Sequence, residues 1–506
     1  MIPLGLIFAL AADASAQAPR LTEAEASDWA RITSDQGVLA FLSDLQTTTP
    51  KMLVEEIGTT GLGRPILAVF LGDPVAATPD THLSSDKPTV LITGSIHGDE
   101  PVGREAALQV IRELTVGVHQ DLLRSVNVIL VPQMNPDGAE ANIRENAAGY
   151  DLNRDWVTAE TPEVAAVLER LVTRFWPDVF LDVHNGGAPP YHLTYQTSLE
   201  PAADPDLVAF ARGPVFEAVR TRLSAAGMEM FWYSGPIRDE ASSTWFWRTT
   251  EPWPRKQHSY GGLRDIMALL YEVPEEHPFE IGVAAAFEGM VGLLELVAAR
   301  PDEVRGVVRE ARRRTLEEPL DSVYLELVPE AYPEPEEFYV IAPGDNGGPV
   351  RTRLVQGVNQ TRYVPARTRP APWGYVFDGR LGELAAFLRR HGVQVERTLQ
   401  AATIPVGRYW VVEVGREEER YHNHRRVDLR VELDTAQVDL DRGSYLVRVQ
   451  QPAGRLVPQL LEPDAVDSAF RWNFIDAYLP VPRTEDSYLP AYRLEGPPGV
   501  PTAVLP

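Results

Sequence analysis

The sequence of 506 residues contains no cysteine, which excludes disulfide bonds and thiol chemistry. Basic residues are also scarce, because 47 Lys and Arg stand against 72 Asp and Glu, for a net charge of −25. Binding to nucleic acid or to an anionic membrane surface depends on clustered Lys and Arg, so we expect neither as the main partner. An acidic average still permits a local basic pocket for a small anionic group.

Long hydrophobic runs are the next absence, and we predict no stable membrane span. The opening segment "MIPLGLIFALAADASAQAPR" has an apolar stretch too short to cross a bilayer, followed by the small-x-small pattern Ala14-Ser15-Ala16. We predict residues 1–19 as a signal peptide and an exported chain, periplasmic or secreted. The first positive residue is Arg20, so the basic start usual for such signals is missing, and a misplaced start or a frayed terminus is the alternative.

The composition is that of a globular protein, with 44% hydrophobic and 24% charged residues, and the length indicates two or three compact units. Over residues 20–316, buried strands such as "KPTVLITGSI" alternate with helical patterns. This alternation predicts an α/β catalytic domain with a mostly parallel or mixed sheet covered by helices. Residues 317–336, rich in Pro and Glu, are predicted as a linker. Residues 337–506 are predicted as a C-terminal accessory region of α/β and β-rich character.

Polar side chains follow four of the predicted strands. In open α/β sheets, ligands bind beyond the carboxyl ends of the strands, so these side chains are expected to share one edge. "VLITGSI" is followed by His97 and Glu100, "VILVPQM" by Asn135, Asp137 and Arg144, "VFLDV" by His184, and "IMALLY" by Glu272.

Two imidazoles and one carboxylate in this set suit a catalytic zinc ion, which takes three protein ligands and leaves a position for water. The candidates are His97, Glu100 and His184. The HxxE pair alone is a weak signal that also fits a polar loop, and a histidine that closes a buried strand also fits a satisfied core residue. Glu272 has apolar neighbours on the strand side, and burial there would raise its pKa toward the range of a general base.

The segment "NIRENAAGYDLNRDW" contributes Arg144, Asn153 and Arg154. One arginine can hold a carboxylate through two hydrogen bonds, and a second can polarise a carbonyl and stabilise an oxyanion. The alternative is that these residues pair with the neighbouring acidic groups Glu145, Asp151 and Asp155.

In this order, "HGDE", "NPDG", "DLNR", His184 and Glu272 resemble the zinc carboxypeptidase family (peptidase M14), in its compact bacterial type. The segment "VEEIGTTGLGRPILAVFLG" is also similar to that family, and the resemblance covers roughly residues 25–300. It implies one zinc ion per catalytic domain, held by His97, Glu100 and His184, with Glu272 as general base. It further implies that Arg144 polarises the scissile carbonyl and that Asn153 and Arg154 hold the terminal carboxylate of the substrate.

The expected activity is therefore hydrolysis of C-terminal peptide bonds by metal-activated water, on peptides with a free C-terminal carboxylate. The substrate-side tyrosine of the family is assigned to Tyr260, with Arg264 and His258 as further pocket candidates. A first rival hypothesis is a zinc-dependent deacylase of N-acyl amino acids, resembling aspartoacylases and succinylglutamate desuccinylases. "NPDG", the long segment before the first ligand and the export signal favour the peptidase. A second rival hypothesis is a catalytically inactive binding module.

The remaining histidines and tryptophans have two interpretations each. His422 and His424 alternate and could form a metal pair, but no third ligand is evident, so an exposed turn or strand is expected. His192 could line the same pocket as His184. Four tryptophans could form an apolar wall for the substrate or belong to the core, namely Trp232, Trp245, Trp247 and Trp253.

Overall fold

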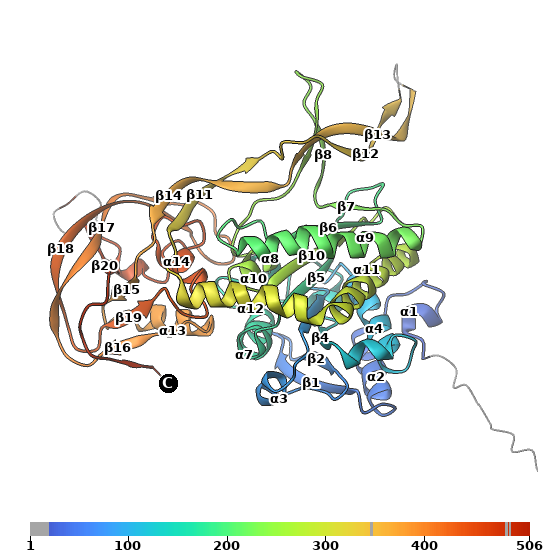
Figure 1. Cartoon of the computed structure of the whole chain (residues 1–506), viewed down its shortest axis with the longest axis horizontal. Helices are drawn as coiled ribbons and strands as arrows, with labels where there is room; N and C mark the ends of the chain where they lie inside the picture. The colour runs from blue at the N-terminus through green and yellow to red at the C-terminus, as the bar shows by residue number, and fades with distance from the viewer. Residues whose placement is uncertain (1–19, 345–347, 481–483, 485–486, 506) are drawn as a thin grey trace, which may run out of the picture.

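The computed structural model describes residues 20–344, 348–480, 484 and 487–505. The predicted signal peptide, residues 1–19, lies outside the described residues. Figure 1 shows a helix-covered sheet at one end of the molecule, a second β-rich region at the other, and a ribbon of strands that projects above both.

The catalytic region is built on an eight-stranded sheet of order β1-β2-β4-β3-β5-β10-β6-β7. Its four central strands, β4, β3, β5 and β10, are mutually parallel, whereas β1, β2 and β6 join it in antiparallel pairs. The sheet is therefore mixed, which is one of the two forms predicted from the sequence. The strands are β1 Met52–Thr59, β2 Pro65–Leu71, β3 Thr89–Gly94, β4 Asn127–Val131, β5 Val179–Asn185, β6 Leu193–Thr197, β7 Met230–Trp232 and β10 Met267–Val273.

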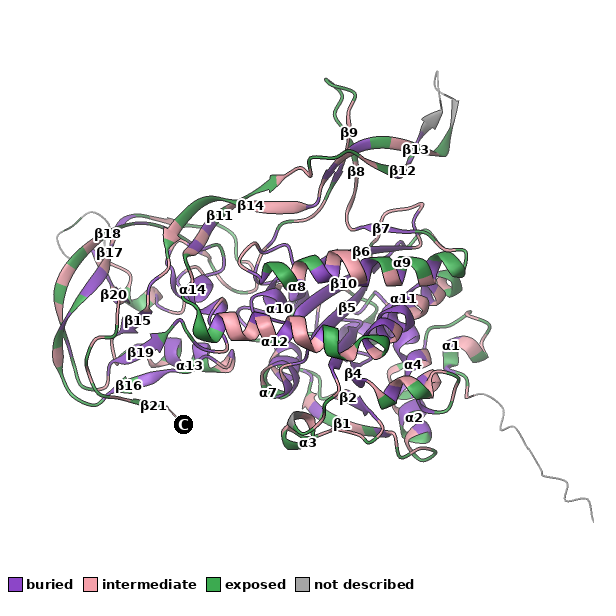
Figure 2. Cartoon of the chain, in the orientation of Figure 1, coloured by how far each residue is buried: buried purple, intermediate pink, exposed green. Residues whose placement is uncertain are grey.

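The central strands read as continuous apolar runs because both faces of the sheet are covered. Alternate residues of β3 enter different hydrophobic clusters, Val90 and Ile92 in one and Leu91 in the other. Figure 2 shows β5 and β10 buried along their length. The covering helices include α2 Asp35–Gln46, α4 Val102–Thr115, α6 Pro162–Val167, α7 Thr173–Phe175, α8 Pro205–Phe210, α9 Phe216–Ala225, α10 Gln257–Gly262, α11 Phe279–Ala299 and α12 Pro301–Glu317.

Helix α11 is an exception to the scarcity of long hydrophobic runs, because its length and mean hydropathy of 1.8 are sufficient to cross a membrane. However, 67% of its most apolar window is buried inside the structure. It packs on β10, α4 and α9, and this burial is typical of a core helix. The helical pattern that continues beyond it is broken at Arg300, where Pro301 begins α12.

The C-terminal region contains a seven-stranded sheet in which all neighbouring strands are antiparallel. The predicted strand-helix-strand unit is present as β15, α13 and β16. The elements of this region are β15 Gly374–Phe377, α13 Gly382–Arg390, β16 Glu396–Thr398, β17 Ala402–Arg416, β18 Val427–Leu440, β19 Tyr445–Arg448, α14 Leu456–Leu461, β20 Tyr488–Leu494 and β21 Thr502–Val504.

Residues 317–336, predicted as a linker, contain part of an ordered ribbon instead of an irregular connection. Strand β11 (Ser322–Glu330) pairs with β14 (Arg362–Pro370). The next strands, β12 (Glu336–Gly344) and β13 (Gly348–Gln360), form a four-stranded sheet with β9 and β8 of the catalytic region. The sequence pattern did not indicate β8 (Gly235–Arg238) and β9 (Trp245–Arg248), because the partner strand β13 lies far along the chain.

One hydrophobic cluster joins the two regions. It contains Phe180 and Trp156 of the catalytic region together with Phe387, Trp472 and Leu460 of the C-terminal region, all buried. The C-terminal region therefore packs directly against one covered face of the catalytic sheet.

Candidate metal and catalytic site

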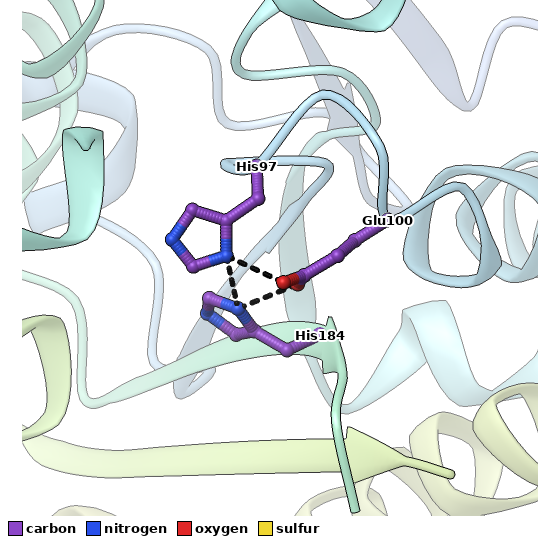
Figure 3. Close-up of side chains that lie close together, drawn as sticks. All are labelled: His97, Glu100 and His184. Atoms are coloured by element: carbon purple, nitrogen blue, oxygen red, sulfur yellow. Dashed lines mark hydrogen bonds and ion pairs between the residues drawn. The ribbon is translucent and has the colours of Figure 1, made fainter. Parts of the chain in front are cut away.

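The three predicted metal ligands meet at the carboxyl end of the central strands (Figure 3). His97 lies in the loop after β3, Glu100 just before α4, and His184 near the end of β5. The Nδ1 atoms of the two histidines are 3.1 Å apart, and the Glu100 carboxylate lies 2.7 Å from His97 Nδ1 and 2.9 Å from His184 Nδ1. All three side chains are buried, with exposed fractions of 2%, 5% and 1%.

This donor set fits a divalent cation. Two N–H groups facing each other at 3.1 Å would repel, whereas two nitrogen lone pairs and a carboxylate can converge on one positive ion. The outer nitrogen of each ring has its own carboxylate: Nε2 of His97 lies 3.0 Å from Asp151, and Nε2 of His184 lies 2.8 Å from Asp182. Such carboxylate partners fix the ring orientation and tautomer of metal-binding histidines.

The electrostatics of the site agree with this geometry. Burial opposes a charge on His184, but Asp182 and Glu100 outweigh burial and raise its pKa well above the usual value. Burial likewise opposes ionisation of Glu100, yet the two histidines lower its pKa far below the usual range. Excess negative charge is thus collected around the two ring nitrogens, as a cation site requires.

Glu272 on β10 is the register partner of His184 on the adjacent parallel strand β5. Burial, with a smaller contribution from the charge of Glu100, raises its pKa to about 7. Its carboxylate accepts a hydrogen bond from the phenol of Tyr233. Tyr233 was missed in the sequence because it follows β7, which runs antiparallel to β10, so the strand-end rule does not apply to it.

A short loop holds the segment 95–100 against the start of α5 (Pro136–Ala141). A Cβ at Gly98 would lie 2.0 Å from the backbone of Gly138, so only glycine permits this approach. Asn135 caps α5 by accepting from the Gly138 amide, and Asp137 pairs with Arg64 at 2.7 Å. Asn135 and Asp137 therefore shape the edge of the site rather than contribute chemistry.

Arg144 faces both the metal-ligand group and its own acidic neighbour. Its Nη1 donates to Glu100 at 3.1 Å, and its Nε and Nη2 donate to Asp151 at 3.2 and 3.0 Å. The predicted pairing with Asp151 and the predicted position beside the metal site are therefore both present. The side chain is 38% exposed, so one side of the guanidinium remains accessible.

Asn153 and Arg154 lie in a short 3-10 helix, η2 (Leu152–Arg154). Asn153 Nδ2 is 3.3 Å from His184 Nε2, and its carbonyl oxygen Oδ1 accepts from the Gln257 amide at 2.9 Å. Arg154 donates to the Asn153 backbone carbonyl and is 4.0 Å from Asp151. A further cation, Lys256, has its pKa lowered to about 8 by burial and by the nearby charge of Arg154. Arg154 and Lys256 therefore bring two cationic side chains to this end of the site, where Lys256 also pairs with Glu251 at 3.4 Å.

Two of the pocket candidates do not reach the site. Tyr260 is fully buried on α10, and its hydroxyl hydrogen-bonds to His391 Nδ1 at 2.9 Å. Arg264 is 3% exposed and donates to the His391 carbonyl. Both predictions are corrected, because Tyr260 on α10 and Arg264 just after this helix contact His391 of the C-terminal region instead of the site. His258 is also buried, and burial, with smaller contributions from the charges of Lys256 and His184, lowers its pKa well below the usual value.

His192 and two of the tryptophans have packing roles, and His422 and His424 lie in a turn. Trp232 and Trp247 belong to the core, and Trp232 stacks on Phe216 at 4.0 Å. The His192 ring stacks on the His277 ring, with 4.7 Å between the ring centroids, and its Nδ1 accepts a hydrogen bond from the Glu229 amide. His422 and His424 form a turn and not a metal pair, since His424 hydrogen-bonds to Glu160 at 2.9 Å.

Known proteins are similar to this chain. A sequence model of the family described as zinc carboxypeptidase matches residues 38–198. Carboxypeptidase 2 of Trichophyton tonsurans is 24% identical over 440 residues, covering 81% of this chain and 77% of the fungal protein. The Trichophyton rubrum protein of that name is 23% identical over 488 residues, covering 92% and 87%. A solved metallo-carboxypeptidase from Burkholderia cenocepacia has a TM-score of 0.42 and 23% identity, over 53% of this chain and 70% of that chain. Residues 38–198 therefore match the zinc carboxypeptidase family, and the similarity of the rest of the chain to curated carboxypeptidases supports the same family.

Proposed function

We propose that this protein is a zinc-dependent metallocarboxypeptidase that removes C-terminal residues from peptides. The observation that carries the proposal is the convergence of His97, Glu100 and His184 beside Glu272. The donor types and their burial suit zinc, which in hydrolases takes nitrogen and oxygen ligands from three residues. Bound there, zinc would lower the pKa of a water molecule and polarise a carbonyl group.

In this proposal Glu272 moves the proton. Its carboxylate takes a proton from the attacking water and returns it to the amine that leaves as the peptide bond breaks. A pKa near neutrality suits both transfers, since the group must be ionised first and protonated next. The Tyr233 hydroxyl, which donates to this carboxylate, fixes its orientation.

Arg144 is proposed to stabilise the negative charge that develops on the carbonyl oxygen. It already lies 3.1 Å from Glu100 and is held by Asp151, so it requires little rearrangement to do so. Asn153 and Arg154 are proposed to bind the terminal carboxylate, with Lys256 adding positive charge. Such an anchor limits cleavage to the bond nearest the C-terminus.

The experiment is an assay of purified protein on two substrate classes. Release of a free amino acid from the C-terminus of a peptide supports the carboxypeptidase. Release of an acyl group from N-acyl amino acids, with no action on peptides, would support the deacylase instead. Protein with neither activity and without stoichiometric zinc would favour the inactive binding module. Export of the chain and the division at residues 317–336 remain predictions.

A further inference from the structure

A two-residue turn of the C-terminal region lies against the segment that carries Asp151. Tyr421 and His424 exchange two backbone hydrogen bonds of 2.9 Å, which leaves His422 and Asn423 at the tip. Both tip residues have positive φ, +48° and +63°. Residues other than glycine adopt this left-handed conformation at an energetic cost, so the surroundings must hold the turn in place.

The tip of this turn contacts the catalytic segment directly. The Asp151 amide donates to His422 Nε2 at 3.1 Å, and Asn423 donates to the Tyr150 hydroxyl at 3.1 Å. The His422 ring contacts two tyrosine rings. The distance between ring centroids is 4.3 Å to Tyr421 and 4.7 Å to Tyr150. The turn therefore binds the backbone of Asp151 and encloses the residue before it.

The accepting nitrogen of His422 must carry no proton. Burial lowers the pKa of His422 to about 4, so the ring is neutral near pH 7. The protonated nitrogen is then Nδ1, which has no hydrogen-bond partner among the described residues. The ring thus makes a single polar contact within the described part of the chain, and that contact is the Asp151 amide.

Asp151 links this turn to the chemistry. One carboxylate oxygen of Asp151 faces His97 Nε2 at 3.0 Å and accepts from the Asn153 amide at 2.9 Å, and the other accepts from Arg144. A displacement of the Asp151 backbone would therefore move three proposed functional groups together.

Two further contacts from the end of α13 hold the segment that follows. His391 Nε2 donates to the Val157 carbonyl at 2.8 Å, and Arg390 donates to the Ala159 carbonyl at 2.7 Å. The C-terminal region therefore forms hydrogen bonds with the catalytic segment both before and after Asn153 and Arg154.

We propose that His422 is a positioning residue of the active site, through which the C-terminal region fixes Asp151 and, with it, Arg144, His97 and Asn153. The effect on turnover rests on the proposed carboxypeptidase function, whereas the effect on the Asp151 backbone does not. The C-terminal region is in this account a structural part of the catalytic site and not a separate module.

The test compares two substitutions at one position. His422→Asn introduces a residue that tolerates positive φ, but its side chain is too short to place an acceptor where Nε2 lies. His422→Gln places a carbonyl oxygen the same number of bonds from Cα as Nε2 and can keep the hydrogen bond. Arg425→Ala, at an exposed neighbour of the turn, is the matched control. The readouts are hydrogen exchange of a fragment that covers residues 150–154, zinc content, and kcat/KM on a peptide.

For His422→Asn we expect about tenfold faster exchange in that fragment and about tenfold lower kcat/KM, as the loss of one hydrogen bond to a partly buried amide predicts. His422→Gln and Arg425→Ala should stay near wild type in both. Wild-type exchange in His422→Asn, or equal losses in the Asn and Gln variants, would overturn the proposal. If wild-type protein has no peptidase activity, the proposed function fails, and the exchange comparison still decides whether His422 positions Asp151.

Discussion

Glu272 and His184 are register partners on the parallel strands β10 and β5, at the edge where His97 and Glu100 also lie. Strand pairing alone therefore places the proposed base beside a proposed metal ligand. Both strands are buried in the centre of the sheet, where each is paired on both of its sides. Separate substitutions can test the proposed base, the support of the metal ligands and the substrate anchor.

The proposed base is tested by Glu272→Gln. The substitution removes the proton acceptor but no metal ligand, so zinc content should be unchanged while kcat falls by about 10²–10⁴-fold. Glu275→Gln, at an exposed residue three positions further on, should leave kcat near wild type. Turnover of Glu272→Gln close to wild type would remove this residue from the mechanism.

The substrate anchor is tested by Arg154→Ala. Loss of a charged hydrogen bond to the terminal carboxylate should lower kcat/KM about tenfold or more on free peptides, and much less on peptides with an amidated C-terminus. Arg154→Lys keeps the charge, so its kcat/KM on free peptides should lie between those of the wild type and Arg154→Ala. Equal losses on free and amidated peptides would argue against this anchor.

The partner of His184 is tested by Asp182→Asn. Asp182 is fully buried, and its charge fixes the His184 ring, so zinc affinity should fall by about tenfold or more in a chelator competition. Asp178→Asn changes a buried carboxylate before the start of the same strand, where it accepts from the Thr89 amide. An affinity loss in Asp178→Asn as large as in Asp182→Asn would indicate a general effect on the sheet.

The pH dependence of stability is tested at Glu200. Burial raises its pKa to about 8, so the folded state retains a proton that the unfolded chain loses near pH 4.5. This group therefore has no effect on stability below pH 4.5 and destabilises the fold increasingly as pH rises toward 8. Glu200→Gln should raise Tm by several degrees at pH 8 and change it little at pH 4.5. A Tm difference that does not vary with pH would contradict the buried, protonated carboxyl.

The strands that carry the site could be predicted because each is a continuous apolar run with a polar residue at its carboxyl end. His97, Glu100, His184 and Glu272 follow from that rule together with the family motifs. The assignment of Tyr260 was wrong because helical periodicity does not reveal which face of a six-residue helix is covered by a distant region.

The contacts of the C-terminal region could not be predicted. His422 and Asp151 are separated by 271 residues, and neither local pattern indicates the other. Asp151 was predicted only as a partner for arginine, although its carboxylate also faces His97. Such roles depend on long-range packing and therefore require the three-dimensional structure.

The most direct measurement is metal analysis of the purified chain combined with a C-terminal release assay. We expect one zinc ion per chain, loss of amino-acid release after chelation, and recovery of release when zinc is restored. His184→Ala should abolish both zinc binding and release. Protein that contains no stoichiometric zinc, or that releases C-terminal residues equally well after the metal is removed, would contradict the proposed zinc-dependent carboxypeptidase function.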